Sequence, residues 1–231
     1  MNKKIYGVVF GARTAGKTTL SATLPGKTIL LQAAVYESGS RSAQKLAKKL
    51  GNELEVRTFH DLVDFWTELE KCVADKTADH LFVDGFTALN EMNWNSDEIQ
   101  RAHKANAFAA YDQHGKKMKD IVKKIKEKSY DNAGDKNVWL TCSLRVEKLN
   151  VNGEDDVKLE VHGKMGISEL VGRGEIVVTA MEVPTKDGQK RGLLTKSYGG
   201  YFGRIDGVLD DENPGWVEPD LSLVLKLSEG A

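Results

Sequence analysis

The chain has 231 residues, of which 40% are hydrophobic and 29% are charged, and its formal net charge is −1. This length and composition predict a single α/β domain with a substantial apolar core. No apolar run approaches the roughly 20 residues of a membrane-spanning helix, so we expect no contact with a membrane. Two cysteines, Cys72 and Cys142, stand in apolar segments without metal-ligand spacing and favour a reducing, cytoplasmic compartment.

The first half of the chain alternates predicted strands and helices, which is typical of a parallel sheet with crossover helices. Strands are expected at 5–10, 28–33, 54–59, 80–84 and 138–143. Helices are expected at 17–24 and 41–50, after residue 61, and over most of 95–128. Asp61 is the expected N-cap of the third helix, and Gly115 is where we expect the long helix to break.

The second half changes to an antiparallel pattern. Alternating segments at 146–151 and 157–161 flank Asn152-Gly153, which is a strong hairpin signal. A second hairpin is expected from 176–183 and 192–196, which flank a turn region that includes Asp187-Gly188. The remaining chain is acidic, and we expect 221–227 to form an edge strand.

Residues 11–18 read Gly-Ala-Arg-Thr-Ala-Gly-Lys-Thr and fit the phosphate-loop pattern G-x-x-x-x-G-K-[ST] at every fixed position. A predicted strand precedes them and a predicted helix follows, so backbone N–H groups and a helix N-terminus point at one polyphosphate. Lys17 is expected to reach the β- and γ-phosphates, and the Thr18 hydroxyl is expected to ligate Mg²⁺. The predicted ATP-binding residues are Gly11, Ala12, Arg13, Thr14, Ala15, Gly16, Lys17, Thr18 and Thr19.

The competing interpretation of this segment is a glycine turn followed by an exposed lysine. The flanking strand and helix favour the phosphate loop. Cleavage after the short N-terminal apolar run would destroy the loop, so we expect no signal peptide.

Two carboxylates are candidate partners of the phosphate loop. Asp84 ends an apolar strand and is expected to position Mg²⁺ at the C-terminal edge of the sheet, the alternative being turn chemistry with Gly85. Glu37 follows the second strand. In ATPases where such a strand lies next to the phosphate-loop strand, a glutamate at its end polarises the attacking water. A solvated loop glutamate is the equal alternative.

Other polar residues have possible roles at the same edge. Thr141 and Ser143 end a further core strand, where a polar group can sense the γ-phosphate or simply terminate the strand. Arg204 and Lys196 lie in a glycine-rich segment, and a cation of this kind can complete the catalytic site of a neighbouring subunit. The alternative for both is an ordinary surface cation.

Residues 101–128 carry nine Lys and Arg against three acids. An apolar helix face is expected from Phe108, Tyr111, Met118, Val122 and Ile125. The candidate contacts to single-stranded DNA phosphates are Lys116, Lys119, Lys123, Lys126 and, from a glycine-flanked loop, Lys164. A solvated basic helix face is the alternative.

The phosphate loop, the acidic turn Glu37-Ser38-Gly39, the strand at 81–87 and the trailing hairpins together resemble the small RecA-like ATPases encoded by bacteriophages. These include ATP-binding proteins associated with single-strand annealing and recombination. The resemblance implies a RecA-like core, Mg²⁺-dependent ATP binding, self-assembly and single-stranded DNA binding. By motif match it assigns Lys17 and Thr18 to phosphate and Mg²⁺, Asp84 to the second acid and Glu37 to the water.

We therefore predict an α/β fold with a RecA-like P-loop NTPase core, whose mainly parallel sheet is flanked by helices and carries antiparallel hairpins in its C-terminal half. The expected single domain, 1–231, comprises a nucleotide-binding core at 1–145, a hairpin extension at 146–209 and an acidic segment at 210–231. The expected protein is a homo-oligomeric, Mg²⁺-dependent ATPase of DNA recombination, replication or repair. The alternatives are a nucleotide or small-molecule kinase and a non-hydrolysing nucleotide-regulated DNA-binding or loader module.

Overall fold

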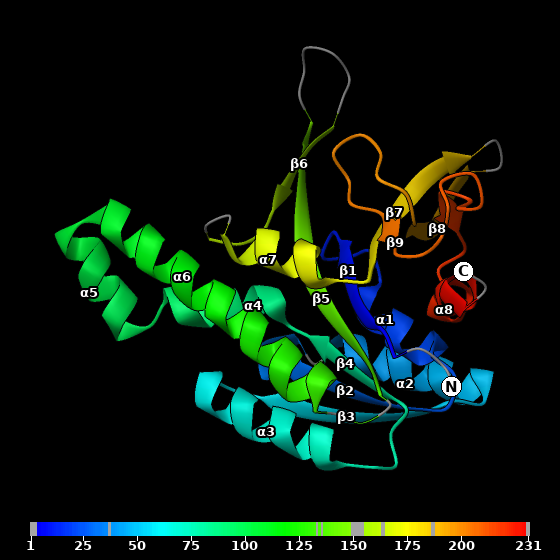
Figure 1. Cartoon of the computed structure of the whole chain (residues 1–231), viewed down its shortest axis with the longest axis horizontal. Helices are drawn as coiled ribbons and strands as arrows, with labels where there is room; N and C mark the ends of the chain where they lie inside the picture. The colour runs from blue at the N-terminus through cyan, green and yellow to red at the C-terminus, as the bar shows by residue number, and fades with distance from the viewer. Residues whose placement is uncertain are drawn as a thin grey trace.

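The computed structural model describes residues 4–36, 38–132, 134, 136–148, 155–162, 165–185 and 188–229. Within these residues, ten strands form a single mixed sheet. Eight of them follow one another in the order β10-β8-β7-β1-β5-β4-β2-β3, while β6 pairs with β5 and β9 pairs with β7. Helices cover both faces of this sheet (Figure 1).

The elements have the following bounds. The strands are β1 (Tyr6–Gly11), β2 (Lys27–Ala33), β3 (Glu53–Phe59), β4 (His80–Asp84), β5 (Asn137–Lys148), β6 (Asp155–Leu159), β7 (Ile176–Thr185), β8 (Gly188–Leu194), β9 (Arg204–Ile205) and β10 (Trp216–Val217). The α-helices are α1 (Lys17–Leu20), α2 (Ser38–Leu50), α3 (Leu62–Ala74), α4 (Phe86–Trp94), α5 (Asp97–Ala105), α6 (Ala107–Ile125), α7 (Met165–Arg173) and α8 (Leu221–Glu229). Shorter helical turns are η1 (Ser21–Thr23), η2 (Ala34–Tyr36) and η3 (Lys126–Asp131).

The central strands β7, β1, β5, β4, β2 and β3 are mutually parallel. Their carboxyl ends therefore share one edge of the sheet, where ligands bind in open α/β folds. Every residue of β1 is buried, because helices lie on both faces and leave no polar side. Gly7 of β1 is required by packing, since a Cβ there would lie 2.2 Å from the Trp139 ring on β5.

The core has two main layers, one on each face of the sheet. Side chains of α3, α4, α6 and α7 pack on one face, including the buried Phe65, Phe86 and Val122. Side chains of α1 and α8 pack on the other face, including Leu20 and Leu221. The predicted α/β fold, a mainly parallel sheet flanked by helices with antiparallel additions, is confirmed.

Both predicted hairpins pair as antiparallel strands. β7 and β8 form the second one, with Glu182 opposite Arg191. β5 and β6 form the first one, although its expected Asn152-Gly153 turn lies outside the described residues. The two strands expected at 138–143 and 146–151 are one continuous strand, β5, which passes across the expected boundary between residues 145 and 146.

Three predictions about helices are wrong. The long helix expected over 95–128 does not break at Gly115, which is buried within an unbroken α6. It breaks at Asn106, whose side-chain oxygen accepts hydrogen bonds from Phe108 N (3.0 Å) and Ala109 N (3.2 Å) and so starts α6 afresh. The edge strand expected at 221–227 is instead the helix α8, whose spacing buries Leu221, Val224 and Leu225 against the sheet.

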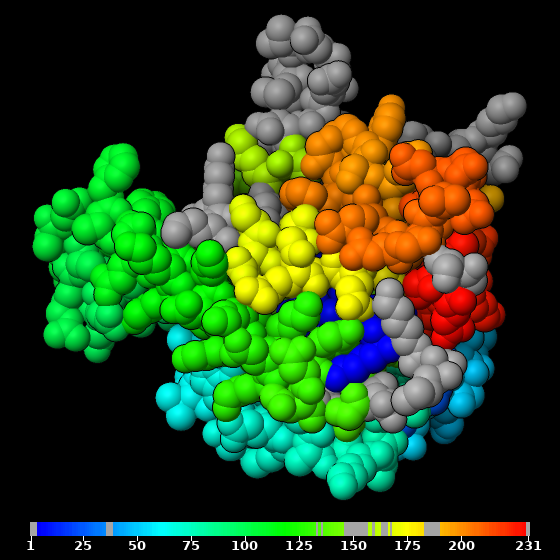
Figure 2. Space-filling model, in the orientation of Figure 1, coloured from blue at the N-terminus to red at the C-terminus, as the bar shows by residue number. Residues whose placement is uncertain are grey.

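The third error concerns the exposed side of α6. Phe108 is 90% exposed and Tyr111 is 46% exposed, so neither belongs to the buried face formed by Met118, Val122 and Ile125. The reason is visible in Figure 2, where α5 and the first part of α6 project from the body of the molecule.

Among the described residues, no helix has the length and apolar character needed to cross a bilayer.

Candidate nucleotide-binding site

The phosphate-loop segment leaves the sheet at the carboxyl end of β1 and turns directly into α1. Gly16 is the N-cap of α1 and has φ of +82°, a left-handed conformation that favours glycine. The loop is closed by a hydrogen bond from Ala15 N to Ala12 O, 3.0 Å long. Its backbone N–H groups and the start of α1 therefore surround one small space.

Lys17 is the buried cation of this loop, with 7% of its surface exposed. Its Nζ donates to the carbonyl oxygens of Gly11 (2.9 Å) and Ala12 (2.8 Å). Burial lowers the pKa of the ammonium group, and the nearby Asp84 carboxylate acts in the opposite direction. The lysine is thus held at the loop in a position from which it can exchange carbonyl oxygens for phosphate oxygens.

Asp84 meets the phosphate loop because of the strand order. β5 lies between β1 and β4, and the register places Thr141 of β5 opposite Asp84 and Ser143 opposite Gly11. The Thr18 and Thr141 hydroxyls each donate a hydrogen bond to the Asp84 carboxylate. A hydroxyl and a carboxylate are the hard oxygen donors that Mg²⁺ prefers, so Thr18 and Asp84 fit the metal role expected of them.

These groups open into one cavity of about 350 Å³, a size typical of ligand pockets. Its walls come from the phosphate loop and α1, from the carboxyl ends of β4 and β5, and from α2 and β8. The lining residues are Arg13, Thr14, Gly16, Lys17, Thr18, Thr19, Val35, Gly39, Asp84, Gly85, Thr87, Thr141, Ser143 and Arg191. The candidate sensors Thr141 and Ser143 therefore face the same space as the loop.

Glu37 lies outside the described residues, so its distance from the loop stays open. The reason given for expecting it is wrong in one respect, because β2 is not next to β1. β5 and β4 separate the two strands, and β2 pairs with β4 so that Gln32 lies opposite Asp84. The following helix does reach the site: a Cβ at Gly39 would lie 3.1 Å from the Thr18 hydroxyl oxygen.

The late cations lie away from the phosphate loop of their own chain. Arg204 on β9 pairs with the amino-terminal part of β7 and donates to the carbonyl oxygens of Val171 and Gly174. It also forms a 2.9 Å ion pair with Asp206. Lys196 forms a 3.3 Å ion pair with Asp210. A role for Arg204 at a neighbouring subunit's site stays a prediction.

Each described candidate for DNA binding has a partner within the chain. The ion pairs are Lys116 with Asp112 (2.7 Å), Lys119 with Glu169 (3.7 Å) and Lys123 with Glu127 (3.6 Å). Lys126 lies over the rings of Tyr6 and Tyr130, at 5.4 Å and 5.3 Å from their centroids. Lys164 lies outside the described residues. These pairs lower the net positive charge of the α6 surface, and its contact with DNA stays a prediction.

Two contacts at the loop could not be predicted from the sequence. Arg191 of β8 lines the cavity, although no motif marks it and it is distant from the loop in the chain. Arg13 donates from Nε to Glu160 (3.0 Å), which follows β6, and lies 3.8 Å from Glu91 of α4. Both contacts depend on the packing of the C-terminal half against the loop, which no local pattern encodes.

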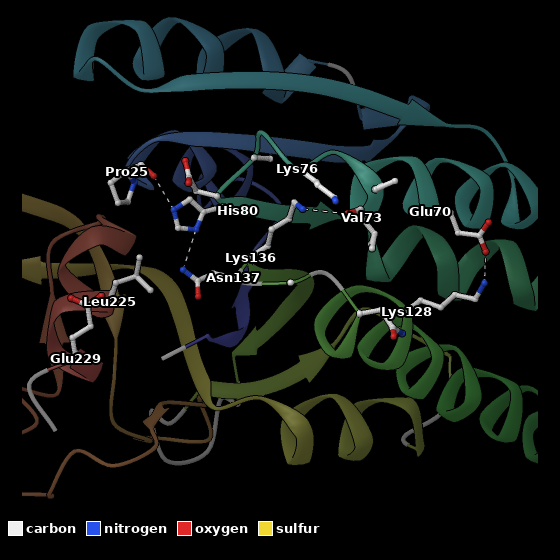
Figure 3. Close-up of a pocket in the computed structure, with 15 residues that line it drawn as sticks. Pro25, Glu70, Val73, Lys76, His80, Lys128, Lys136, Asn137, Leu225 and Glu229 are labelled. Atoms are coloured by element: carbon white, nitrogen blue, oxygen red, sulfur yellow. Dashed lines mark hydrogen bonds and ion pairs between the residues drawn. The ribbon is translucent and has the colours of Figure 1, made fainter. Parts of the chain in front are cut away.

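A larger cavity of about 950 Å³ lies at the opposite edge of the sheet (Figure 3). Here His80, at the start of β4, donates from Nε2 to Pro25 O (2.8 Å), and its Nδ1 accepts from the Asn137 amide (3.3 Å). Lys136 Nζ donates to Val73 O (3.2 Å). The remaining charged groups are of both signs and no phosphate loop is present, so the smaller cavity is the candidate nucleotide site.

A phosphate loop after β1, a second acid at the end of β4 and a strand interposed between them define a P-loop NTPase core. A family model described as an AAA domain matches residues 3–205. The chain therefore belongs to this family of AAA-type P-loop ATPases. A search of curated proteins gives no match to the sequence.

Proposed function

We propose that this protein binds ATP together with Mg²⁺ and hydrolyses its terminal phosphoryl bond. One observation carries the proposal: the buried Lys17 ammonium and the Thr18 hydroxyl share a cavity with the Asp84 carboxylate. Together they supply a cation for the β- and γ-phosphates and oxygen ligands for a divalent ion. Membership of the AAA domain family is independent support.

In this proposal each residue of the site has a separate role. Lys17 moves its N–H donors from the loop carbonyls to phosphate oxygens, while the backbone N–H groups of the loop hold the other phosphates. Thr18 and Asp84 would hold Mg²⁺, which would supply stabilisation of the charge that develops on the transferring group. Thr141 fixes the orientation of Asp84 through its hydrogen bond. Glu37 is our candidate to accept the proton of the attacking water.

We further propose that ATP turnover serves DNA recombination, replication or repair, in a phage-encoded homo-oligomer that binds single-stranded DNA. The support is the resemblance to phage RecA-like ATPases and the excess of basic residues in 101–128. In this proposal, residues 1–231 act as one ATPase domain. Arg204 acts on the site of a neighbouring subunit, and loops that hold the γ-phosphate relax when it leaves.

The test is an ATPase assay with and without single-stranded DNA, run beside a mass measurement of the assembly. We expect Mg²⁺-dependent phosphate release that rises with DNA, and a mass of several chains. ATP binding without phosphate release would leave a nucleotide-regulated DNA-binding module. Phosphate transfer to a nucleoside or nucleotide would identify a kinase instead.

The DNA part of the proposal has its own test. Changing Lys119, Lys123 and Lys126 to Gln should weaken single-stranded DNA binding. It should also reduce the slope of log affinity against log salt by about 2, because each lost phosphate contact removes roughly 0.7. The matched control changes Lys45, Lys48 and Lys49, which are exposed on α2, and should leave the slope unaltered. A slope that stays the same in both triple variants would identify the α6 lysines as solvated.

A further inference from the structure

Arg191 reaches the phosphate loop from the side of the sheet that Asp84 does not occupy. In the strand order, β7 and β8 lie on one flank of β1, while β5 and β4 lie on the other. Gly11, the last residue of β1, pairs with Ala180 of β7, and β7 continues beyond this pair. Glu182 of β7 and its partner Arg191 on β8 therefore lie past the end of β1. The guanidinium group of Arg191 thereby enters the cavity of the loop.

The guanidinium group of Arg191 lies near the start of α1. A Cβ at Gly16 would lie 4.0 Å from Arg191 Nη1, and among the described residues no other heavy atom outside Gly16 and its two chain neighbours comes within that distance. The only ion pair described for the guanidinium group joins its Nε to the Glu182 carboxylate at 2.8 Å. That bond uses one donor of five and leaves the face toward Gly16 with donors to offer.

The two sides of the phosphate loop are placed to contact different parts of a nucleoside triphosphate. Lys17 would reach the β- and γ-phosphates, and Thr18 with Asp84 would hold the metal ion that supplies positive charge to the triphosphate. The α-phosphate and the nucleoside must then leave on the side away from Asp84. A guanidinium group beside Gly16 on that side has the planar donor geometry that suits a phosphate.

We propose that Arg191 binds the α-phosphate of a nucleotide held in the site of its own chain. This inference rests on the proposed function, because it assigns a further contact within the ATP site. In this assignment Arg191 binds the α-phosphate, which ATP and ADP share, and it does not sense the γ-phosphate. Loss of a charge-assisted hydrogen bond of this kind corresponds to a decrease in affinity of roughly 10- to 100-fold.

The test measures equilibrium binding of ATP and of ADP to Arg191→Gln in the full chain. We expect both affinities to fall by the same factor, with little change in the turnover rate at saturating ATP. Arg191→Lys should recover part of the loss, because it restores the charge without the planar fork. A loss confined to ATP, or to turnover, would overturn the assignment to the α-phosphate.

Two matched variants separate binding from a merely structural role. Glu182→Gln removes the present ion pair and should leave nucleotide affinity unchanged or raise it, since Arg191 is released. Lys190→Gln removes the same charge one residue earlier on β8, where the side chain points to the other face of the strand, and should have no effect. Equal losses of affinity in Glu182→Gln and Arg191→Gln would show that the ion pair only holds the hairpin.

A mixing experiment tests whether Arg191 acts within its own chain. Lys17→Ala keeps Arg191 but has a defective loop, and Arg191→Gln keeps the loop. If Arg191 served a neighbouring subunit, mixing the two would restore tight binding, so we expect no restoration. Failure of the wild-type protein to bind ATP would refute the proposed function as well. Wild-type affinity in Arg191→Gln would refute this inference alone.

Discussion

The two edges of the parallel sheet each hold a cavity and a buried lysine, yet they differ in what surrounds the lysine. At the carboxyl edge, Lys17 shares about 350 Å³ with Thr18, Asp84 and Thr141, and the groups complement one another for a phosphate and a metal. At the amino edge, Lys136 has one carbonyl partner beside a cavity of about 950 Å³. The larger cavity lies at the amino edge, which lacks the complementary groups for a phosphate and a metal. Convergence of complementary groups, and not size, identifies the site.

The largest effect is expected from replacing each of these two lysines with alanine. Lys17→Ala should weaken ATP binding by at least roughly 100-fold, because the β- and γ-phosphates lose their shared cation. Lys136→Ala should leave ATP affinity at the wild-type value, although Lys136 is as little exposed as Lys17. Equilibrium binding of ATP measures both. Comparable losses in the two variants would break the contrast between the edges.

The carboxylates at the two ends of β4 offer the next test. Asp84→Asn should lower Mg²⁺ affinity and Mg²⁺-dependent hydrolysis by roughly 10- to 100-fold, which is the range for disturbing a metal site. Asp79, just before the strand, accepts a 2.8 Å hydrogen bond from Lys27 N, and Asp79→Asn should affect stability by about 1 kcal/mol without changing hydrolysis.

A magnesium titration of ATPase activity, beside thermal unfolding, separates these two outcomes. If Asp84→Asn kept the magnesium dependence of the wild type, Asp84 would be a turn residue only. If Asp79→Asn lost activity to the same extent, the effect would belong to strand β4 as a whole and not to its carboxyl end.

The smallest effect is expected from the pH dependence of folding stability, to which His80 at the amino edge contributes. Burial lowers the pKa of His80, and it also lowers the pKa of His114 and of His162. Because the folded pKa lies below the unfolded value of about 6.5, the free energy of unfolding is highest above that pH and falls as pH decreases. The melting temperature should therefore drop between about pH 7 and pH 5.

His80→Gln should reduce this acid sensitivity, because its amide can still donate to Pro25 O but cannot be protonated. The comparison is the difference in melting temperature between the two pH values, for wild type and variant. Identical differences would show that His80 does not contribute to the acid sensitivity.

Local signals were enough to predict the parts of the fold that depend on neighbouring residues. The strand before the phosphate loop, the Asp84 strand and both hairpins follow from apolar runs and turn residues. The cap of α3 also follows, since Asp61 accepts hydrogen bonds from Val63 N and Asp64 N.

The remaining features depend on contacts between distant parts of the chain. Residues 221–227 alternate well enough for a strand, but they form the helix α8, which buries Leu221, Val224 and Leu225 against the apolar layer on this face of the sheet. Phe108 fits the spacing of a buried face, but α6 extends beyond the body that would cover it. Arg191 enters the site through the registers of β1 with β7 and of β7 with β8, which no segment of sequence reveals.

The unbroken strand β5 joins the candidate nucleotide cavity to the hairpin with β6. It starts at the amino edge, passes the cavity at Thr141 and continues to Lys148 in the hairpin with β6, a span of about 40 Å at 3.3 Å per residue. Figure 1 shows this hairpin standing clear of the sheet. Thr141 at the cavity and the residues that pair with β6 therefore lie on one continuous strand, with no loop between them.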